Sequence, residues 1–424
     1  MAKAMNSIQK VIIIGGGPAA ILAALRLQRT NGISPVLYEI RQNVTTLGGA
    51  IGIPSNGLRL LNRLGLYEEC VSKGALTPHI VLHGLNGSVL GEMDMADWSE
   101  QQTGFGYLRI RRTDIMDLLL RAAEKEHIPI HYGKTLTSIW ERGDEVTVEF
   151  ADGTTDTADF LLGCDGIHSS VRKLYIDPGA KPEYTGISNM YSLLPTHLLP
   201  IAIDPVANLN ATLTPDGLFA VSPVTKTSDV LYWFFSREVA MPKSGDVRDG
   251  WETTQKAEVE GFRSTVLELL GEDKSDWVQT LRGLVQNTDS VKFYPIYKLP
   301  AGRTWHKGRC LIIGDAAHAM PPHASQGVSM ALEDVFLFSK LLASSNMSLD
   351  QGLDAYVAKR KARTEAMLSK AEDNGSVRRR TPAWRVKAKE YAIWGGLWLF
   401  KTTGLGRMGM GQKDLTYDVE SEEF

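Results

Sequence analysis

The stretch VIIIGGGPAAILAALRLQ, which begins at Val11, constrains the fold more than any other part of the chain. Its first four residues are β-branched, lack polar alternation and predict a strand buried on both faces. Three glycines follow, and Pro18 suits the first turn of a helix because an N–H at that position would have no helical partner. Ala19–Gln28 are good helix formers with apolar residues at helical spacing. The stretch therefore predicts a strand, a tight glycine turn and a helix.

The glycine turn has the spacing of a dinucleotide-binding site. Gly15 permits the sharp turn, Gly17 lets a pyrophosphate approach the backbone, and the small Ala20 lets helix and strand pack closely. The phosphate would lie at the helix N-terminus, where free N–H groups favour an anion. The next predicted strand ends at Glu39, where a carboxylate can bind an unphosphorylated ribose, as in FAD or NAD. An ordinary strand–helix–strand unit with a glycine corner is the alternative, and this pattern alone does not separate FAD from NAD.

The overall composition excludes several other classes of protein. The 424 residues suffice for two or three domains, and 43% hydrophobic with 22% charged residues is typical of globular proteins. The net charge of −3 gives no indication of nucleic-acid binding. Three cysteines form no disulfide framework, and no signal peptide precedes the first strand, so a cytoplasmic location is expected. No apolar run reaches the roughly 20 residues of a membrane span.

Two further predicted strands end in an aspartate beside a glycine. The run FLLGC precedes Asp165 and Gly166, and the run CLII precedes Gly314 and Asp315. Both aspartates stand at the carboxyl end of a buried strand, where α/β folds bind their ligands. Taken singly, each is explained as well by an Asx turn before a helix as by a hydrogen bond to a ligand hydroxyl.

Together with the glycine turn, these motifs resemble the class A flavoprotein monooxygenases, the family of para-hydroxybenzoate and salicylate hydroxylases. The resemblance covers most of residues 10–370 and includes LGGAIGIPSNGLRLLNRLGL, RIRRTDIMDLLL, CDGIHSSVR, GDAAHAMPP and YVAKRKAR. It implies that Arg112 contacts FAD, that Asp315 holds the ribityl chain, and that Asp165 serves both FAD and a pyridine nucleotide. The cofactor-binding residues indicated by the pattern and the resemblance are Gly15, Gly17, Ala20, Glu39, Gly49, Ala50, Arg112, Asp165, Gly166, Gly314, Asp315, Pro322, Gly327 and Val328.

Two departures from the family pattern concern the predicted active site. Many members read Gly-Gln-Gly after the Gly-Asp motif, whereas this chain has Ser325 in the first place, followed by Gln326 and Gly327. The backbone N–H groups of Gly327 and Val328 can still face the flavin. Many aromatic hydroxylases of the family also have an arginine five residues after Tyr-Thr-Gly, where this chain has Tyr191. The arginine of those members is therefore not carried over, and this segment is more similar to the tetracycline-inactivating branch.

The order of the motifs predicts an α/β fold. It combines a Rossmann-like FAD-binding domain, whose parallel sheet is discontinuous in sequence, with a mainly antiparallel β-sheet substrate domain and C-terminal helices. The runs ISNMYSLL, ANLNATLTP, GLFAVSPV and DVLYWFFSR predict strands of the second sheet, and residues 251–271 are expected to be helical. The predicted divisions are 8–75, 104–180 and 300–374 for the FAD-binding domain, 76–103 and 181–299 for the substrate domain, and 375–424 for the C-terminal helical segment.

The resemblance implies an FAD-dependent monooxygenase. NADPH or NADH would reduce FAD, O2 would form a flavin C4a-hydroperoxide, and a hydroxyl (or an epoxide oxygen) would pass to the substrate. The uncharged Tyr191 and its apolar neighbours predict a neutral, hydrophobic aromatic or polycyclic substrate, because burying an isolated anion there is costly. An anionic substrate would need another cation in the cavity, such as Arg237 or Lys298. A redox sensor or scaffold that binds FAD and a ligand without turnover is the alternative, and the W-x-W-x-I-P motif of related halogenases is not found.

The resemblance assigns no catalytic side chain, because oxygen transfer requires no side-chain base. Tyr191, Tyr232 and His323 are candidates for the lining of the substrate cavity, although aromatic residues on a sheet are as often core. His318 is expected to be a hydrogen-bonded structural residue. His79, which shares a predicted strand with another histidine, has no evident acid or cysteine to complete a metal site, so no metal is expected.

The C-terminal run YAIWGGLWLF is aromatic and too short to cross a membrane. A terminal helix that caps the two domains is the favoured interpretation. An interfacial membrane helix is the alternative, and the two glycines that interrupt its apolar face argue against it.

Overall fold

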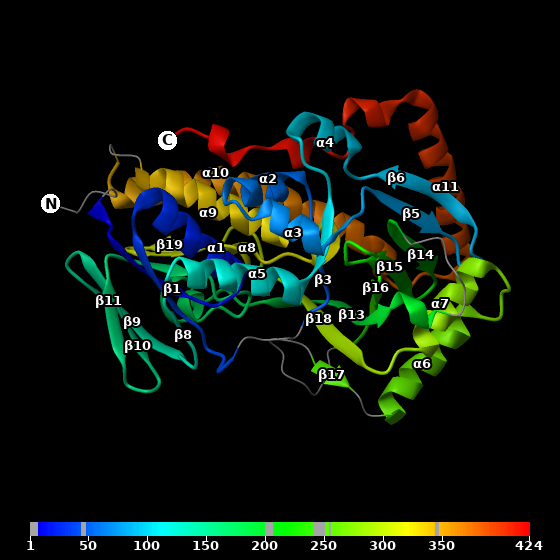
Figure 1. Cartoon of the computed structure of the whole chain (residues 1–424), viewed down its shortest axis with the longest axis horizontal. Helices are drawn as coiled ribbons and strands as arrows, with labels where there is room; N and C mark the ends of the chain where they lie inside the picture. The colour runs from blue at the N-terminus through cyan, green and yellow to red at the C-terminus, as the bar shows by residue number, and fades with distance from the viewer. Residues whose placement is uncertain (1–6, 44–47, 200–206, 241–250, 254–255, 344–346) are drawn as a thin grey trace.

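The computed structural model describes residues 7–43, 48–199, 207–240, 251–253, 256–343 and 347–424 (Figure 1). A six-stranded sheet in the order β19-β20-β12-β1-β2-β8 forms its centre, and every neighbouring pair except β19–β20 is parallel. Its strands are β1 (Lys10–Ile14), β2 (Ser34–Tyr38), β8 (Ile130–His131), β12 (Phe160–Gly163), β19 (His306–Lys307) and β20 (Cys310–Ile312).

Sequence patterns explain why the first part of this sheet forms. The apolar side chains of β1 are buried, as expected for a strand covered on both faces. Helix α1 (Pro18–Arg26) follows, continues as a π-helical turn to Asn31, and ends at Gly32 with φ +65°. Helices α5 (Arg112–Lys125), α9 (Gly327–Ala343) and α10 (Leu349–Gly375) complete the layers, with α1 packed against α5 and α9 and with α9 packed against α10. The predicted strand, glycine turn and helix are confirmed.

A second, eight-stranded sheet has the order β17-β18-β13-β16-β15-β14-β5-β6 and is antiparallel except between β14 and β5. Its strands are β5 (His79–His83), β6 (Val89–Asp94), β13 (Glu183–Pro195), β14 (Leu209–Thr214), β15 (Gly217–Pro223), β16 (Val230–Glu238), β17 (Trp251–Thr253) and β18 (Val291–Lys298). The four strands predicted between 187 and 237 are confirmed. The helix expected from 251 is wrong for Trp251–Thr253, which pairs with β18, and α6 spans Lys256–Leu270.

The two faces of this sheet have different surroundings. One face packs against α6 and α7 (Asp276–Gln286) in an apolar core that includes Trp233. The other face carries Tyr191 and Tyr232 and meets Ala50 of the first part of the chain. The α/β fold with a parallel and a mainly antiparallel sheet is thus confirmed, and the division of the chain into six domain segments stays a prediction.

Two small sheets complete the fold. The sheet β3-β7-β4 consists of β3 (Ala50–Ile53), β7 (Leu108–Arg111) and β4 (Ala75–Leu76). It lies beside helices α2 (Ser55–Arg63) and α3 (Tyr67–Lys73), and α4 (Asp97–Thr103) packs against α2. The sheet β11-β10-β9 consists of β9 (Leu136–Arg142), β10 (Glu145–Phe150) and β11 (Thr155–Ala158) and forms one end of the molecule (Figure 1). The three cysteines are free and buried; the cytoplasmic location stays a prediction.

Helix α11 (Ala383–Thr403) lies against β6 and β14 at the end of the molecule opposite β9–β11 (Figure 1). Its inner side places Leu397 against Gly91. The chain then returns toward the central helices, where Asp418 pairs with Arg63 at 2.6 Å. The expected terminal helix is therefore present. Among the described helices, none combines the length and apolar character needed to cross a bilayer.

Candidate functional site

The glycine loop after β1 contains two glycines with different requirements. Gly15 has φ +119°, and a Cβ built on it would lie 2.4 Å from the carbonyl oxygen of Cys164. Gly17 begins α1 as its N-cap, and no protein atom lies within 4 Å of a Cβ built there. The helix has no acidic residue in its first turn and no side-chain cap. An anion could therefore approach Gly17 and the free N–H groups of α1.

Glu39 holds this loop in place. One carboxylate oxygen accepts a hydrogen bond from the N–H of Gly16 at 2.6 Å, and the other accepts one from the N–H of Arg41 at 2.9 Å. The side chain thus lies beside the glycine loop, as the sequence predicts. Its hydrogen bond to a ribose stays a prediction.

The Asp165–Gly166 turn lies directly behind the glycine loop. One carboxylate oxygen of Asp165 accepts hydrogen bonds from the N–H groups of Ser170 and Val171 at 2.5 and 3.1 Å. This geometry supports the turn interpretation. The other oxygen is buried and has no hydrogen-bond partner among the described residues, and its contact with a ligand stays a prediction. Gly166 has φ +73°.

The Gly314–Asp315 turn presents a free carboxylate. Gly314 has φ +59° and precedes α8 (Asp315–His318). The Asp315 side chain is accessible, and no hydrogen bond or ion pair to it exists among the described residues. Desolvation by the surrounding protein raises the pKa of Asp315, and the positive charges of His318 and Arg112 oppose this shift. Arg112 is likewise exposed and without an ion pair in the described part of the chain. Opposite charges therefore converge on the site without neutralising one another.

A buried ionic network beneath the turn fixes its position. Asp334 of α9 accepts hydrogen bonds from the N–H of Gly314 at 2.8 Å, from Nε2 of His318 at 2.6 Å and from Nε of Arg360 at 2.7 Å. Neighbouring Glu333 accepts one from Nη1 of Arg360 at 2.7 Å. The structural role expected for His318 is confirmed. The network supports Asp315 from below, and the two acids of α9 were not predicted from the sequence.

The proline loop leads from this turn to α9. Pro322 begins a short 3-10 turn that ends at Ala324, and Ser325 then has φ +52°. A left-handed conformation favours glycine, which explains the glycine that many family members have at this place. Gly327 begins α9 and is exposed, and Val328 beside it is half-buried. The helix N-terminus is thus open, as expected.

Tyr191 and Tyr232 form an aromatic pair over the segment predicted to lie beside the flavin. Their ring centroids are 5.6 Å apart, on the same face of the large sheet. A Cβ on Gly49 would lie 2.4 Å from Tyr232 and 3.1 Å from Tyr191, so only glycine fits beneath the pair. Ala50 packs against the same cluster. The structure therefore brings Tyr191 and Tyr232 together with Gly49 and Ala50, which come from a distant part of the sequence.

His323 is placed against the C-terminal end of α10. Its ring lies 3.2 Å from a Cβ built on Gly375, and its carbonyl accepts a hydrogen bond from Asn374. Burial, together with the positive charge of Arg378, lowers the pKa of His323 to about 2. The imidazole is therefore neutral at any ordinary pH, and its contact with substrate stays a prediction.

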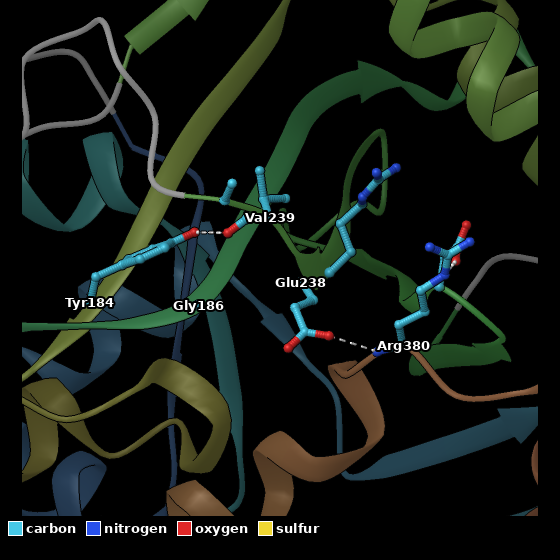
Figure 2. A pocket seen from close by; sticks show the side chains of 8 residues that line it. Tyr184, Gly186, Glu238, Val239 and Arg380 are labelled. Atoms are coloured by element: carbon cyan, nitrogen blue, oxygen red, sulfur yellow. Dashed lines mark hydrogen bonds and ion pairs between the residues drawn. The ribbon is translucent and has the colours of Figure 1, made fainter.

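Arg237 and Lys298, the cations considered for the substrate cavity, lie elsewhere. Arg237 occupies the opposite face of β16 from Tyr232, because residues of opposite parity alternate across a strand. It lines an outer cavity of about 590 Å³ at the end of β13 and β16, shown in Figure 2, where Tyr184 donates a hydrogen bond to the carbonyl of Val239 at 2.9 Å. Lys298 pairs with Glu372 at 2.5 Å.

One cluster near the protein surface contains metal-ligating side chains. His79, Asp94 and Asp97 each place a ligand atom within 4.8 Å of the others, so the expectation that no acid stands near His79 is wrong. Both oxygens of Asp94 already accept hydrogen bonds, from backbone N–H groups and from Gln412. His83 points elsewhere and bonds to Asn210. Exposed acids beside a histidine are common without an ion, and we assign no metal to this cluster.

The described residues fit a dinucleotide. Gly17 leaves room for a pyrophosphate, and the Asp315 carboxylate and the Arg112 guanidinium are accessible and unpaired in the described part of the chain. Residues 9–371 also match the FAD binding domain family. The chain belongs to this family. FAD is therefore the cofactor. Gly17, Arg112, Asp315 and the N-terminus of α9 are accessible to a ligand, and their contacts with FAD stay a prediction.

Individual flavin monooxygenases resemble the chain along most of its length. It is 28% identical over 386 residues to 6-hydroxynicotinate 3-monooxygenase of Pseudomonas fluorescens, covering 90% of this chain and 95% of that protein. Its fold resembles Klebsiella pneumoniae HpxO complexed with FAD and uric acid, with a TM-score of 0.79, 20% identity and 96% of each chain covered. It also resembles a salicylate hydroxylase substrate complex, with a TM-score of 0.73, 23% identity and coverage of 98% and 97%. The expected class A flavin monooxygenase family is confirmed.

Proposed function

We propose that this flavin monooxygenase uses NADPH or NADH and O2 to hydroxylate the ring of an aromatic small molecule. The single observation that supports this most is the aromatic pair Tyr191–Tyr232 packed over Gly49 and Ala50. The pair gives a planar ring a complementary surface beside the segment expected to contact the flavin. Relatives named for 6-hydroxynicotinate and urate, both planar rings, are consistent with this substrate class.

The roles of the protein's own groups follow from their positions. FAD, when bound, supplies the redox chemistry: it accepts electrons from the nicotinamide and activates oxygen. Arg112 and the N-termini of α1 and α9 bind its negative charge, and Asp315 accepts hydrogen bonds from its hydroxyls. Tyr191 and Tyr232 pack the substrate ring and exclude water, which protects the activated oxygen from loss as hydrogen peroxide. The oxygen-transfer route expected from the resemblance stays a prediction.

The function is tested by NADPH consumption and O2 uptake of the FAD-loaded protein with a panel of aromatic acids, phenols and polycycles. We expect at least one compound to accelerate NADPH oxidation several-fold and to yield a hydroxylated product, detected by mass spectrometry. Slow oxidation that no compound accelerates, with unchanged ligand recovered, would instead support the sensor or scaffold.

The exposed face of α11 supports a second proposal, about a partner. Trp384, Tyr391 and Trp398 recur every seven residues and so share one face, and with Trp394 they are 57–74% exposed. Aromatic side chains with this exposure are typical of interaction surfaces and of membrane interfaces. The acid of this helix, Glu390, is buried, so the charges that α11 exposes are all basic. We propose that this face rests on an anionic lipid surface, because two copies of a basic helix would repel each other.

Flotation with lipid vesicles tests this attachment. We expect the protein to float with vesicles that contain phosphatidylserine, less at high salt, and much less with phosphatidylcholine alone. The double variant Trp394→Ser/Trp398→Ser should lose the binding, whereas Trp140→Ser, an exposed tryptophan on β9, should retain it. Self-association that the double variant abolishes, without any vesicle binding, would assign the face to a second copy.

The expectation of a neutral substrate depended on a cavity without a cation. Arg109 of β7 is a buried cation whose charge acts on Tyr232. The absence of an arginine at position 191 is therefore no longer a reason to expect a neutral substrate.

A further inference from the structure

Arg109 is buried, and no carboxylate of the described residues pairs with it. It is 7% exposed, its Nε has no hydrogen-bond partner among the described residues, and its one hydrogen bond there runs from Nη2 to the hydroxyl of Tyr107 at 3.4 Å. Other buried arginines of the described chain have stronger acceptors: Arg360 has two carboxylates, and Arg172 has backbone carbonyls. A guanidinium without such acceptors is costly to bury, which indicates a missing anionic partner.

The strand that carries Arg109 lies beside the aromatic pair. Leu108 and Ile110 of β7 point into the core of the parallel-sheet domain, so Arg109 points to the other face. On the neighbouring strand Gly52 is opposite Arg109, and Ala50, which packs against Tyr191 and Tyr232, is two residues away. The free side of the guanidinium therefore faces the region where the aromatic pair meets β3.

The surroundings on this face keep the guanidinium near the reaction site. A Cβ on Gly52 would overlap the Tyr107 hydroxyl and lie 3.1 Å from Ser325, so β3 lies close both to the Tyr107 side chain and to the loop that leads to Gly327. Burial mainly raises the pKa of Tyr232, and the charge of Arg109 opposes this shift, which is consistent with their proximity. Arg109 is thus linked through the Tyr107 hydroxyl and Gly52 to the loop that precedes α9.

We propose that Arg109, with the Tyr107 hydroxyl, binds the carboxylate of an aromatic substrate whose ring packs against Tyr191 and Tyr232. A guanidinium presents parallel N–H donors that match the two oxygens of a carboxylate. The cation thus comes from β7, whereas many aromatic hydroxylases of the family have theirs at the position of Tyr191. This substrate class rests on the proposed function, and it replaces the neutral substrate expected from Tyr191 alone.

Calorimetric titration of the FAD-loaded protein with benzoate and with benzamide tests the subsite without requiring turnover. We expect benzoate to bind more tightly than benzamide, and Arg109→Gln to weaken benzoate binding by roughly tenfold or more while leaving benzamide unchanged. Arg109→Lys, which keeps the charge and loses the planar fork, should give an intermediate affinity. The lysine variant also tests the proposal if the glutamine variant does not fold.

Arg111→Gln is the matched control. It removes the same charge two residues along the same strand, but its guanidinium is already paired with Asp114 at 2.6 Å, so benzoate affinity should not change. Equal benzoate affinity in Arg109→Gln and the unmodified protein would overturn the proposal. So would loss of FAD in Arg109→Gln alone, because the guanidinium would then serve the cofactor. Arg109-dependent benzoate binding without any accelerated NADPH oxidation would instead contradict the proposed function and leave the subsite standing.

Discussion

Arg360→Met is expected to lower the free energy of unfolding by about 3–5 kcal/mol. The Arg360 guanidinium is fully buried and donates to Asp334 and to Glu333 at 2.7 Å each. Its removal leaves buried carboxylates with reduced compensation, and the expected loss is a large part of the roughly 5–15 kcal/mol that stabilises most domains. Urea unfolding in excess FAD, followed by circular dichroism and flavin fluorescence, measures the loss.

Lys359→Met is the control for this variant. Lys359 directly precedes Arg360 in α10. Its ion pair with Glu422 at 3.1 Å is partly exposed, so its removal should change the free energy of unfolding by less than about 1 kcal/mol. Similar losses in the two variants would show that the network contributes no more than a surface ion pair.

The same network predicts a sensitivity to acid. Burial alone would raise the pKa of Asp334, but the positive charges of His318 and Arg360 lower it overall. Because the folded-state pKa lies below the unfolded value of about 3.9, the ionised carboxylate stabilises the fold above about pH 4. That contribution is lost as the pH falls below this value, and we expect the loss to be smaller in Arg360→Met.

Gly17→Ala is expected to weaken FAD binding by roughly tenfold or more, which is about 1.4 kcal/mol, and to leave the unfolding of the FAD-free protein unchanged. Gly17 has φ −81°, which alanine adopts readily, and no protein atom lies near a Cβ built there. The added methyl group would therefore meet only the cofactor. Fluorescence titration of FAD measures the affinity, and full affinity in this variant would show that the pyrophosphate does not approach Gly17.

Gly15→Ala should instead lower the stability of the FAD-free protein. Its positive φ and its approach to the Cys164 carbonyl require the backbone itself to move, so the FAD-free protein should lose stability. The two variants separate the structural and the ligand-binding parts of one motif. If both behaved alike, the motif would have a single role.

The features set by local pattern could be predicted from the sequence. Buried apolar runs such as Val11–Ile14 predict the parallel strands, and the β-rich runs 187–194 and 229–237 predict two strands of the second sheet. Trp233, by its place in a strand as much a cavity candidate as Tyr232, lies instead in the apolar core on the opposite face. The sequence predicts a helix at Trp251, but the structure has a short strand there. The prediction fails because the extended conformation depends on pairing with β18. Propensity yields to such long-range pairing.

The charged residues of the site were harder to predict. Glu333 and Asp334 lie in a largely apolar helix, and nothing local shows that Arg360 of another helix will neutralise them. Arg109 is one of three nearby arginines in RIRR, and the sequence does not show which of them is paired, exposed or buried alone. Only the packing of β7 between the two large sheets separates their roles.

The strand order of the central sheet has a consequence for synthesis. On the ribosome, β12 emerges with one edge unpaired, and its partner β20 follows only after the 146 residues that separate Gly163 from Cys310. At typical translation rates of about 5–20 residues per second, that edge stays open for about 7–30 s and is exposed to aggregation. Asp315 and α9 emerge later still. Tight FAD loading is therefore expected only when nearly the whole chain has been made, and fragments that end before β20 should precipitate rather than bind the cofactor.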